Sequence, residues 1–180
     1  MVATMVCIVV PIGAASSPSA AACWAPPVVG VVVDPFRAPP CPYCAGNRGI
    51  EYEVAPGTRP IAVAPGTVSF SGVVAGTRYV VVALADGRLV TYGRLVASHL
   101  RVGDRVRTGA AVGMASGPFY FGVRRDGVPV DPTPLLGRWG GVTRLVPTDG
   151  SAANPTTAVL RCASDLRQRL PHGPVTRPIV

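Results

Sequence analysis

The chain has 180 residues, 48% of them hydrophobic, which is enough for one compact domain with tails. Its 21 glycines and 20 prolines, with only 14% charged residues, exclude a protein of long helices and favour short strands joined by turns. The net charge is +8, yet the arginines form no run of five and alternate with no aromatic residues, which disfavours nucleic acid as a partner and leaves an anionic cell-wall polymer as one that suits the charge.

The first segment, residues 1–22, has the order of a secretory signal peptide: about eleven mostly apolar residues, then small ones, then Ala20-Ala21-Ala22. The apolar run is too short to span a bilayer comfortably. No basic residue precedes it, so a start further upstream and a weak signal both stay open. Lipoprotein cleavage before Cys23 is an alternative, although Ala20 stands where leucine is usual. We expect a secreted or cell-envelope protein without a transmembrane segment after cleavage.

Cleavage there removes Cys7 and leaves four cysteines, Cys23, Cys41, Cys44 and Cys162. An even number in an exported chain predicts disulfides, and four cysteines permit three pairings. We favour a local Cys41–Cys44 bridge and a Cys23–Cys162 bridge that ties the two ends of the domain together. The C-P-Y-C pattern also allows a redox motif or half of a zinc site, but it lies in a proline-rich loop and lacks a second ligand pair.

Residues 23–45 are predicted to be an extended, proline-rich segment with a disulfide loop and one strand that ends at Pro35. Residues 46–137 carry β-branched runs spaced by roughly 8–12 residues, which is typical of an antiparallel β-sandwich or open barrel. Asp86-Gly87 and Asp126-Gly127 are turns of the two-residue kind that closes hairpins. The sequence therefore predicts an all-β domain.

Residues 138–180 are predicted to be a C-terminal extension that is partly disordered. Its first half is rich in glycine, threonine and proline, which is typical of a loop. The following stretch allows either a helical turn or two or a final strand around Val159 and Leu160. The last eight residues are expected to be disordered.

Four motifs in this order carry a family resemblance: "APGT…APGTV", "ADGR…TYGRL", "VGDRV" and "FGVR…VDPTPLL". Across about residues 27–137 the chain resembles the lysostaphin-type (LytM) zinc endopeptidase domain, whose members cut peptide cross-links of bacterial peptidoglycan. The resemblance implies a small antiparallel β-sheet domain of the duplicated hybrid motif type, with a groove across one face of the sheet.

The resemblance also locates the family's zinc site. In that family a His and an Asp of G-H-x-G-x-D, with the second His of H-x-H, hold zinc. The first His of H-x-H and a His of Y-x-H-L polarise the attacking water. Here the three ligand positions carry Asn47, Glu51 and Tyr120, and the two water-polarising positions carry Arg94 and Pro118.

These replacements are poor metal donors. Asn47 offers a neutral oxygen, and the Tyr120 phenol would have to lose a proton whose pKa is near 10. Arg94 carries a permanent positive charge that repels a cation. The two histidines of the chain, His99 and His172, are interpreted as solvated. We therefore expect no catalytic residues, no bound metal and no cofactor, with zinc only if an atypical site works.

A different organiser is expected in place of the metal. We predict that Glu51 and Arg94 form an ion pair, with Asn47 and Tyr120 hydrogen-bonded beside it. The alternative places Arg94 in solvent, with Glu51 capping a turn.

The groove itself is expected to be walled by Tyr92, Arg94 and Tyr120. Strand alternation predicts that Phe119 and Phe121 point into the core while Tyr120 faces the groove.

Three functions remain open at this point. The first is a catalytically inactive pseudo-peptidase that binds peptidoglycan peptides or regulates a cell-wall hydrolase, by analogy with family members that lack the zinc ligands and activate wall amidases. The second is an active metalloendopeptidase with an atypical zinc site. The third is a structural exported domain without a ligand.

Overall fold

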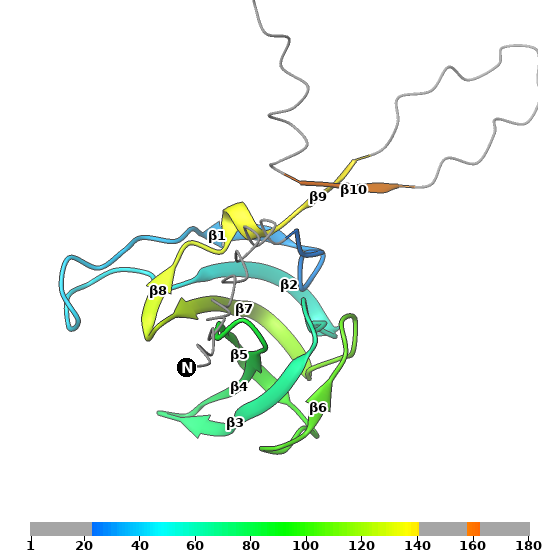
Figure 1. The fold of residues 1–180 in the computed structure, drawn as a ribbon, viewed down its shortest axis with the longest axis horizontal. Helices are drawn as coiled ribbons and strands as arrows, with labels where there is room; N and C mark the ends of the chain where they lie inside the picture. Colours follow the sequence, from blue (N-terminus) through cyan, green and yellow to red (C-terminus); the bar gives the residue numbers. More distant parts are fainter. Residues whose placement is uncertain (1–22, 141–157, 163–180) are drawn as a thin grey trace, which may run out of the picture.

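The strands account for nearly all regular structure in the computed structural model, which describes residues 23–140 and 158–162 (Figure 1). They are β1 (Val31–Asp34), β2 (Ile50–Thr58), β3 (Gly66–Val74), β4 (Thr77–Leu84), β5 (Leu89–Ala97), β6 (Arg105–Val106), β7 (Met114–Arg125), β8 (Val128–Val130), β9 (Arg138–Gly140) and β10 (Val159–Arg161). One short 3-10 turn, η1 (Thr133–Leu135), is the sole helical element within those two ranges. They contain no helix with the length and apolar character needed to cross a membrane. The all-β prediction is confirmed.

Eight strands form one antiparallel sheet in the order β1-β2-β7-β5-β4-β3-β6, with β8 paired to β7. Figure 1 shows that this sheet curves strongly from β1 to β6. The fold is therefore closer to the predicted open barrel than to a sandwich of two facing sheets. A separate small sheet pairs β9 with β10.

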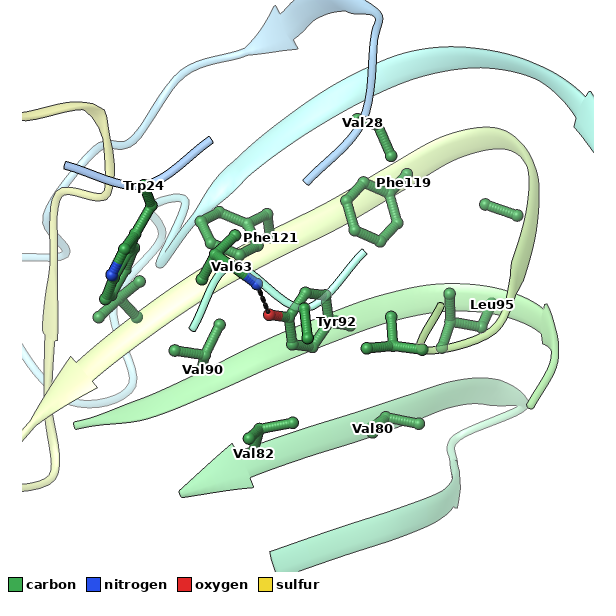
Figure 2. Packing of buried hydrophobic residues seen from close by; sticks show 14 of the residues in the cluster. Trp24, Val28, Val63, Val80, Val82, Val90, Tyr92, Leu95, Phe119 and Phe121 are labelled. Carbon is green, nitrogen blue, oxygen red and sulfur yellow. Dashed lines mark hydrogen bonds between the residues drawn. The ribbon is translucent and has the colours of Figure 1, made fainter. Parts of the chain in front are cut away.

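The hydrophobic core lies on one face of the large sheet. Phe119, Phe121 and Val123 of β7 are fully buried, and the Tyr92 ring of β5 meets Phe121 edge-on at 5.6 Å between centroids. The Tyr92 hydroxyl accepts a hydrogen bond of 3.0 Å from the backbone N–H of Val63, as Figure 2 shows. Because successive strand residues point to opposite faces, the residues between these core positions are directed to the other face of the sheet.

Two disulfides have the pairing that the sequence predicted. Cys23–Cys162 joins positions 139 residues apart, and Cys41–Cys44 closes a loop before β2. The long bridge attaches the β9–β10 sheet to the start of the described chain. The strand alternative is correct at 159–161, whereas the expected signal peptide and the disordered tail lie outside the described residues.

The hairpin turns are partly as predicted. The β7–β8 turn has two residues, Asp126 and Gly127, with φ of 51° and 78°, as a two-residue hairpin loop requires. The β4–β5 connection is longer, because the Leu84 N–H donates to the Arg88 carbonyl at 2.9 Å and leaves three residues in the loop. The Asp86 carboxylate accepts a 2.8 Å hydrogen bond from Arg88 Nε, and this guanidinium lies 4.4 Å from the Trp24 ring centroid. The Arg88 side chain at the end of the loop thus packs against Trp24, the residue that follows Cys23.

Candidate functional site

A row of residues crosses four strands on the face opposite the core. Glu51 of β2 is paired with Tyr120 of β7, Tyr120 with Gly93 of β5, and Gly93 with Tyr79 of β4. Directly opposite residues on neighbouring antiparallel strands lie side by side on one face of the sheet. Strand register alone therefore brings together two of the predicted site positions, Glu51 and Tyr120, from segments far apart in the sequence.

This row forms the floor of a groove of about 560 Å³. The groove is lined by Gly46, Asn47, Arg48, Glu51, Phe70, Val74, Tyr79, Val81, Thr91, Arg94, Tyr120 and Arg124. Three of these residues are arginines and one is an acid, so the lining carries a net positive charge.

Arg94 reaches the groove through a β-bulge. Tyr92 and Leu95 both face the core although they are three positions apart on β5, which strict alternation does not allow. Gly93 and Leu95 pair with consecutive residues of β4, so Arg94 is the extra residue, and its φ is 57°. The bulge returns Leu95 to the core and leaves Arg94 on the exposed face.

The predicted Glu51–Arg94 ion pair is present. Arg94 Nη2 donates to Glu51 Oε1 at 2.7 Å, and the exposed fractions of the two side chains are 45% and 16%. Because the arginine is nearly half exposed, solvent screens the attraction and the pair contributes at most about 1 kcal/mol to stability. Its main effect is to fix the two side chains across the groove, from β2 to β5.

We expect Glu51→Gln to lower the free energy of unfolding by less than about 1 kcal/mol, because only a screened ion pair is lost. Thermal unfolding measures this change. Glu53→Gln is the matched control, since Glu53 lies two residues further along β2, on the same face, and is exposed. An equal fall in melting temperature for both variants would contradict a specific Glu51–Arg94 contribution.

The Tyr120 ring lies over three glycines. A Cβ atom at Gly49 would lie 2.8 Å from this ring, one at Gly93 would lie 3.1 Å from it, and one at Gly122 would lie 2.6 Å from its hydroxyl oxygen. The Tyr79 ring packs edge-on against it at 6.4 Å between centroids. The aromatic ring is therefore held flat on the sheet, in space that side chains at these positions would fill.

Burial raises the pKa of the Tyr120 phenol above its ordinary value, an effect that the nearby Arg124 and Arg48 oppose in part. The phenol therefore keeps its proton at neutral pH. It is a hydrogen-bond donor to the groove rather than an anionic ligand.

We expect Gly122→Ala to destabilise the protein by about 1 to 3 kcal/mol, because the added methyl group overlaps the Tyr120 hydroxyl. Denaturant unfolding measures the cost. In a Tyr120→Leu background the same substitution should cost much less, since the overlapping atom is gone. Equal costs in both backgrounds would show that Tyr120 does not limit the space at Gly122.

Asn47 does not join the ion pair, contrary to the prediction. It is buried, and its Nδ2 donates to the carbonyls of Asp34 and Pro35, both at 3.2 Å, while its Oδ1 accepts from the N–H of Gly49 at 3.3 Å. The side chain thus fastens the start of β2 to the end of β1. Buried amides need such partners, and the backbone carbonyls here provide them.

One other expectation about the groove was wrong. Tyr92 belongs to the core, with 1% of its surface exposed, and does not line the groove. Pro118 lies on β7 opposite Glu53, exposed and outside the groove lining. Tyr120 does line it between the buried Phe119 and Phe121, as predicted. His99 is exposed, and His172 lies outside the described residues.

Sequence reasoning missed eight of the twelve residues that line the groove. Tyr79, Val81 and Thr91 lie next to buried valines or Tyr92, so strict alternation along β4 and β5 would have placed them on the groove face. Arg124 lies four positions after Tyr120 on β7, so alternation places it on the same face as well. Arg48 follows no such pattern, because it precedes β2.

The side chains at the positions that match the family's zinc ligands are not suited to bind zinc. Asn47 is committed to backbone groups, Glu51 to Arg94, and Tyr120 keeps its proton. A catalytic zinc site needs three ligands with an open position, and no cluster of three His, Cys, Asp or Glu occurs within 23–140 and 158–162. These side chains hold a cation poorly, and Arg94 adds repulsion.

Solved structures share this fold. The Csd3 protein of Helicobacter pylori aligns with a TM-score of 0.58 and 19% identity, over 77% of this chain and 37% of that chain. The catalytic domain of the antimicrobial peptidase lysostaphin from Staphylococcus simulans aligns with a TM-score of 0.51 and 18% identity, over 58% and 90%. The SpoIIQ-SpoIIIAH pore forming complex contains a chain that aligns with a TM-score of 0.57 and 20% identity, over 65% and 92%. This chain thus spans well under half the length of Csd3. At these identities the likeness is one of fold.

A family model also matches part of the sequence. The model of peptidase family M23 matches residues 45–132. Together with the fold, this match makes the segment a peptidase M23, LytM-type domain, as the motifs predicted. No curated protein matches the chain. Asn47, Glu51, Arg94 and Tyr120 all lie inside the matched segment.

Proposed function

We propose that this chain is an exported, catalytically inactive M23-type domain that binds peptidoglycan peptides in the groove. The observation that carries the proposal is a groove of about 560 Å³ at the family's site position, whose donors are engaged with protein groups. The open groove favours a bound ligand over a purely structural domain. The two disulfides support export, since such bridges persist in oxidising compartments.

Groove chemistry suits a peptide. Phe70, Val74 and Val81 provide apolar contacts, while Tyr79 and Tyr120 provide rings with polar ends. Pockets that bind ligands typically combine an apolar lining with a few polar groups that fix orientation. Lysostaphin, which shares the fold, is described as an antimicrobial peptidase, and this supports the substrate class by analogy.

Co-sedimentation with purified peptidoglycan sacculi tests the binding. The oxidised protein should pellet with sacculi, and Thr91→Trp, which places a large ring in the groove, should abolish pelleting. Val96→Trp is the matched control, because Val96 lies on the same strand, exposed and outside the groove lining. If neither the wild type nor the Val96→Trp control pellets with sacculi, the proposal is contradicted.

The same preparation tests the alternative of an active peptidase. Release of soluble peptides from sacculi should be undetectable and unchanged by zinc or by a chelator. Cleavage that a chelator stops would establish an atypical metal site instead.

A second candidate is contact with a partner protein, such as a cell-wall hydrolase that this domain regulates. The support is the SpoIIQ-SpoIIIAH pore forming complex, in which a chain of this fold occurs in a protein assembly. Stimulation of a wall hydrolase on sacculi, lost with Thr91→Trp and kept with Val96→Trp, would favour this candidate.

A further inference from the structure

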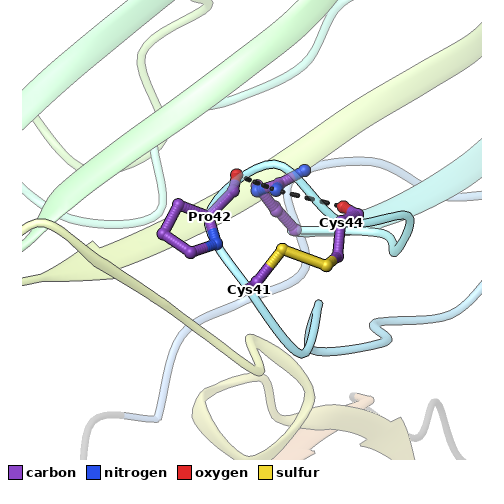
Figure 3. Close-up of a disulfide and its surroundings, with 4 residues drawn as sticks. Cys41, Pro42 and Cys44 are labelled. Carbon is purple, nitrogen blue, oxygen red and sulfur yellow. Dashed lines mark hydrogen bonds between the residues drawn. A yellow bond between two sulfur atoms is a disulfide. The ribbon is translucent and has the colours of Figure 1, made fainter.

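The loop closed by Cys41–Cys44 holds an arginine at the rim of the groove. Arg48 Nη2 donates to the carbonyl oxygen of Pro42 at 2.6 Å and to that of Cys44 at 3.4 Å, and Figure 3 shows these bonds beside the disulfide. Carbonyl oxygens orient a guanidinium but leave its full positive charge uncompensated. The loop therefore presents a fixed cation.

Arg124 supplies a second cation on the same face. It follows Tyr120 and Gly122 along β7 at alternate positions and lines the groove with them. Neither Arg124 nor Arg48 makes an ion pair with an acid of the described ranges, where the three ion pairs involve Arg37, Arg88 and Arg94. The groove is thus lined by two positive charges, those of Arg48 and Arg124, that no acid in the described part of the chain compensates.

These two arginines stand where two hollows meet. Both line the groove, and both line a second hollow of about 520 Å³ between the disulfide loop and the β7–β8 hairpin. Half of the other residues that line the second hollow are prolines, among them Pro39, Pro40 and Pro129. The positive charge is therefore concentrated at one point between largely apolar walls, where the dielectric screening is weaker than in open solvent.

Tyr120 adds a neutral donor at this point. Tyr120 lines the groove together with Arg48 and Arg124. Because the phenol keeps its proton, its hydroxyl is a third hydrogen-bond donor in the groove lining. The one acid nearby, Glu51, is paired with Arg94 and so repels an incoming anion only weakly.

We propose that Arg48, Arg124 and the Tyr120 hydroxyl form a binding site for a carboxylate, namely the free carboxyl end of a peptide lying in the groove. This inference rests on the proposed function and specifies which end of the peptide is recognised. Guanidinium groups bind carboxylates through paired N–H donors, and the phenol donates to the remaining oxygen lone pairs. The apolar residues Phe70, Val74 and Val81 then contact the peptide residues that precede its C-terminal residue. An inorganic anion has no such residues and would lack these contacts.

The test compares tetra-alanine with a free C-terminal carboxylate, tetra-alanine amide and inorganic phosphate, each titrated into the oxidised protein and followed by NMR. The free acid should bind at least about tenfold more tightly than the amide, since two charge-assisted contacts are lost in the amide. Arg124→Gln and Arg48→Gln should each remove about tenfold of affinity for the acid and little for the amide.

Arg125→Gln is the matched control. Arg125 is the next residue on β7 and is exposed, and the groove lining does not include it, so removing its charge should leave the preference for the acid intact. Equal affinity for acid and amide would overturn the inference. Phosphate binding as tightly as the acid, with the same dependence on Arg124, would also overturn it, because the site would then read any small anion.

Co-sedimentation with sacculi, compared with the peptide titrations, distinguishes failure of this inference from failure of the proposed function. Wild type that pellets with sacculi but binds acid and amide equally refutes the carboxylate site and keeps the proposed function. Wild type that prefers the acid but ignores sacculi supports the carboxylate site and refutes peptidoglycan as the source of the peptide.

Discussion

The combined variant Asn47→His, Glu51→Asp, Arg94→His and Tyr120→His is expected to bind zinc with micromolar or tighter affinity, whereas the wild type should hold no stoichiometric metal. The physical reason is the donor set. The wild-type positions offer an amide bound to backbone, a carboxylate paired with arginine, and a protonated phenol. Micromolar binding requires about 8 kcal/mol, and zinc sites in small domains provide about 10 to 16 kcal/mol. Metal analysis after dialysis, with chelator competition, measures the change.

The control keeps Arg94 and makes the other three substitutions. Its zinc affinity should be at least about tenfold lower, because a permanent cation stays beside the metal. Stoichiometric zinc in the wild-type protein would contradict our account of the site, and so would equal affinity with and without Arg94.

The second large effect concerns stability. Removing the long bridge with Cys23→Ala and Cys162→Ala is expected to lower the free energy of unfolding by up to about 5 kcal/mol, because a cross-link between positions 139 residues apart restricts the unfolded chain strongly. Denaturant unfolding under non-reducing conditions measures this loss.

The short bridge is the control. Cys41 and Cys44 are three residues apart, so Cys41→Ala with Cys44→Ala should cost about 2 kcal/mol or less on the same entropic argument. A loss from the short bridge that equals or exceeds that from the long one would show that loop entropy does not govern stability here.

Much of the fold could be predicted from local pattern. Three predictions depended only on neighbouring residues or on the chemistry of the compartment: the alternation around Phe119 and Phe121, the Asp126-Gly127 turn, and the disulfides expected from the even cysteine count. The structure confirms the strands, the turn and the bridges. The single curved sheet could not be distinguished from a sandwich, because strand order depends on pairing between distant segments. The three-residue β4–β5 loop was also not predicted, and Arg88 at its end contacts both the neighbouring Asp86 and the distant Trp24.

The site was predictable in part for the same reason. Family positions indicated that Glu51 and Arg94 face one another, and they do. Asn47 was placed wrongly because its partners are carbonyls twelve and thirteen residues earlier in the chain. Tyr92 was assigned to the groove from its motif, although its neighbours Thr91 and Gly93 already occupy that face and leave the core to Tyr92.

The left-handed backbone at position 94 limits which amino acids evolution or engineering can place there. Glycine and asparagine adopt φ near 57° easily, while valine, isoleucine and threonine are strongly disfavoured, whatever their chemistry toward a ligand. A saturation library at this position should therefore sort first by conformational preference and only then by charge. Arginine at position 94 carries a backbone cost that glycine would not carry.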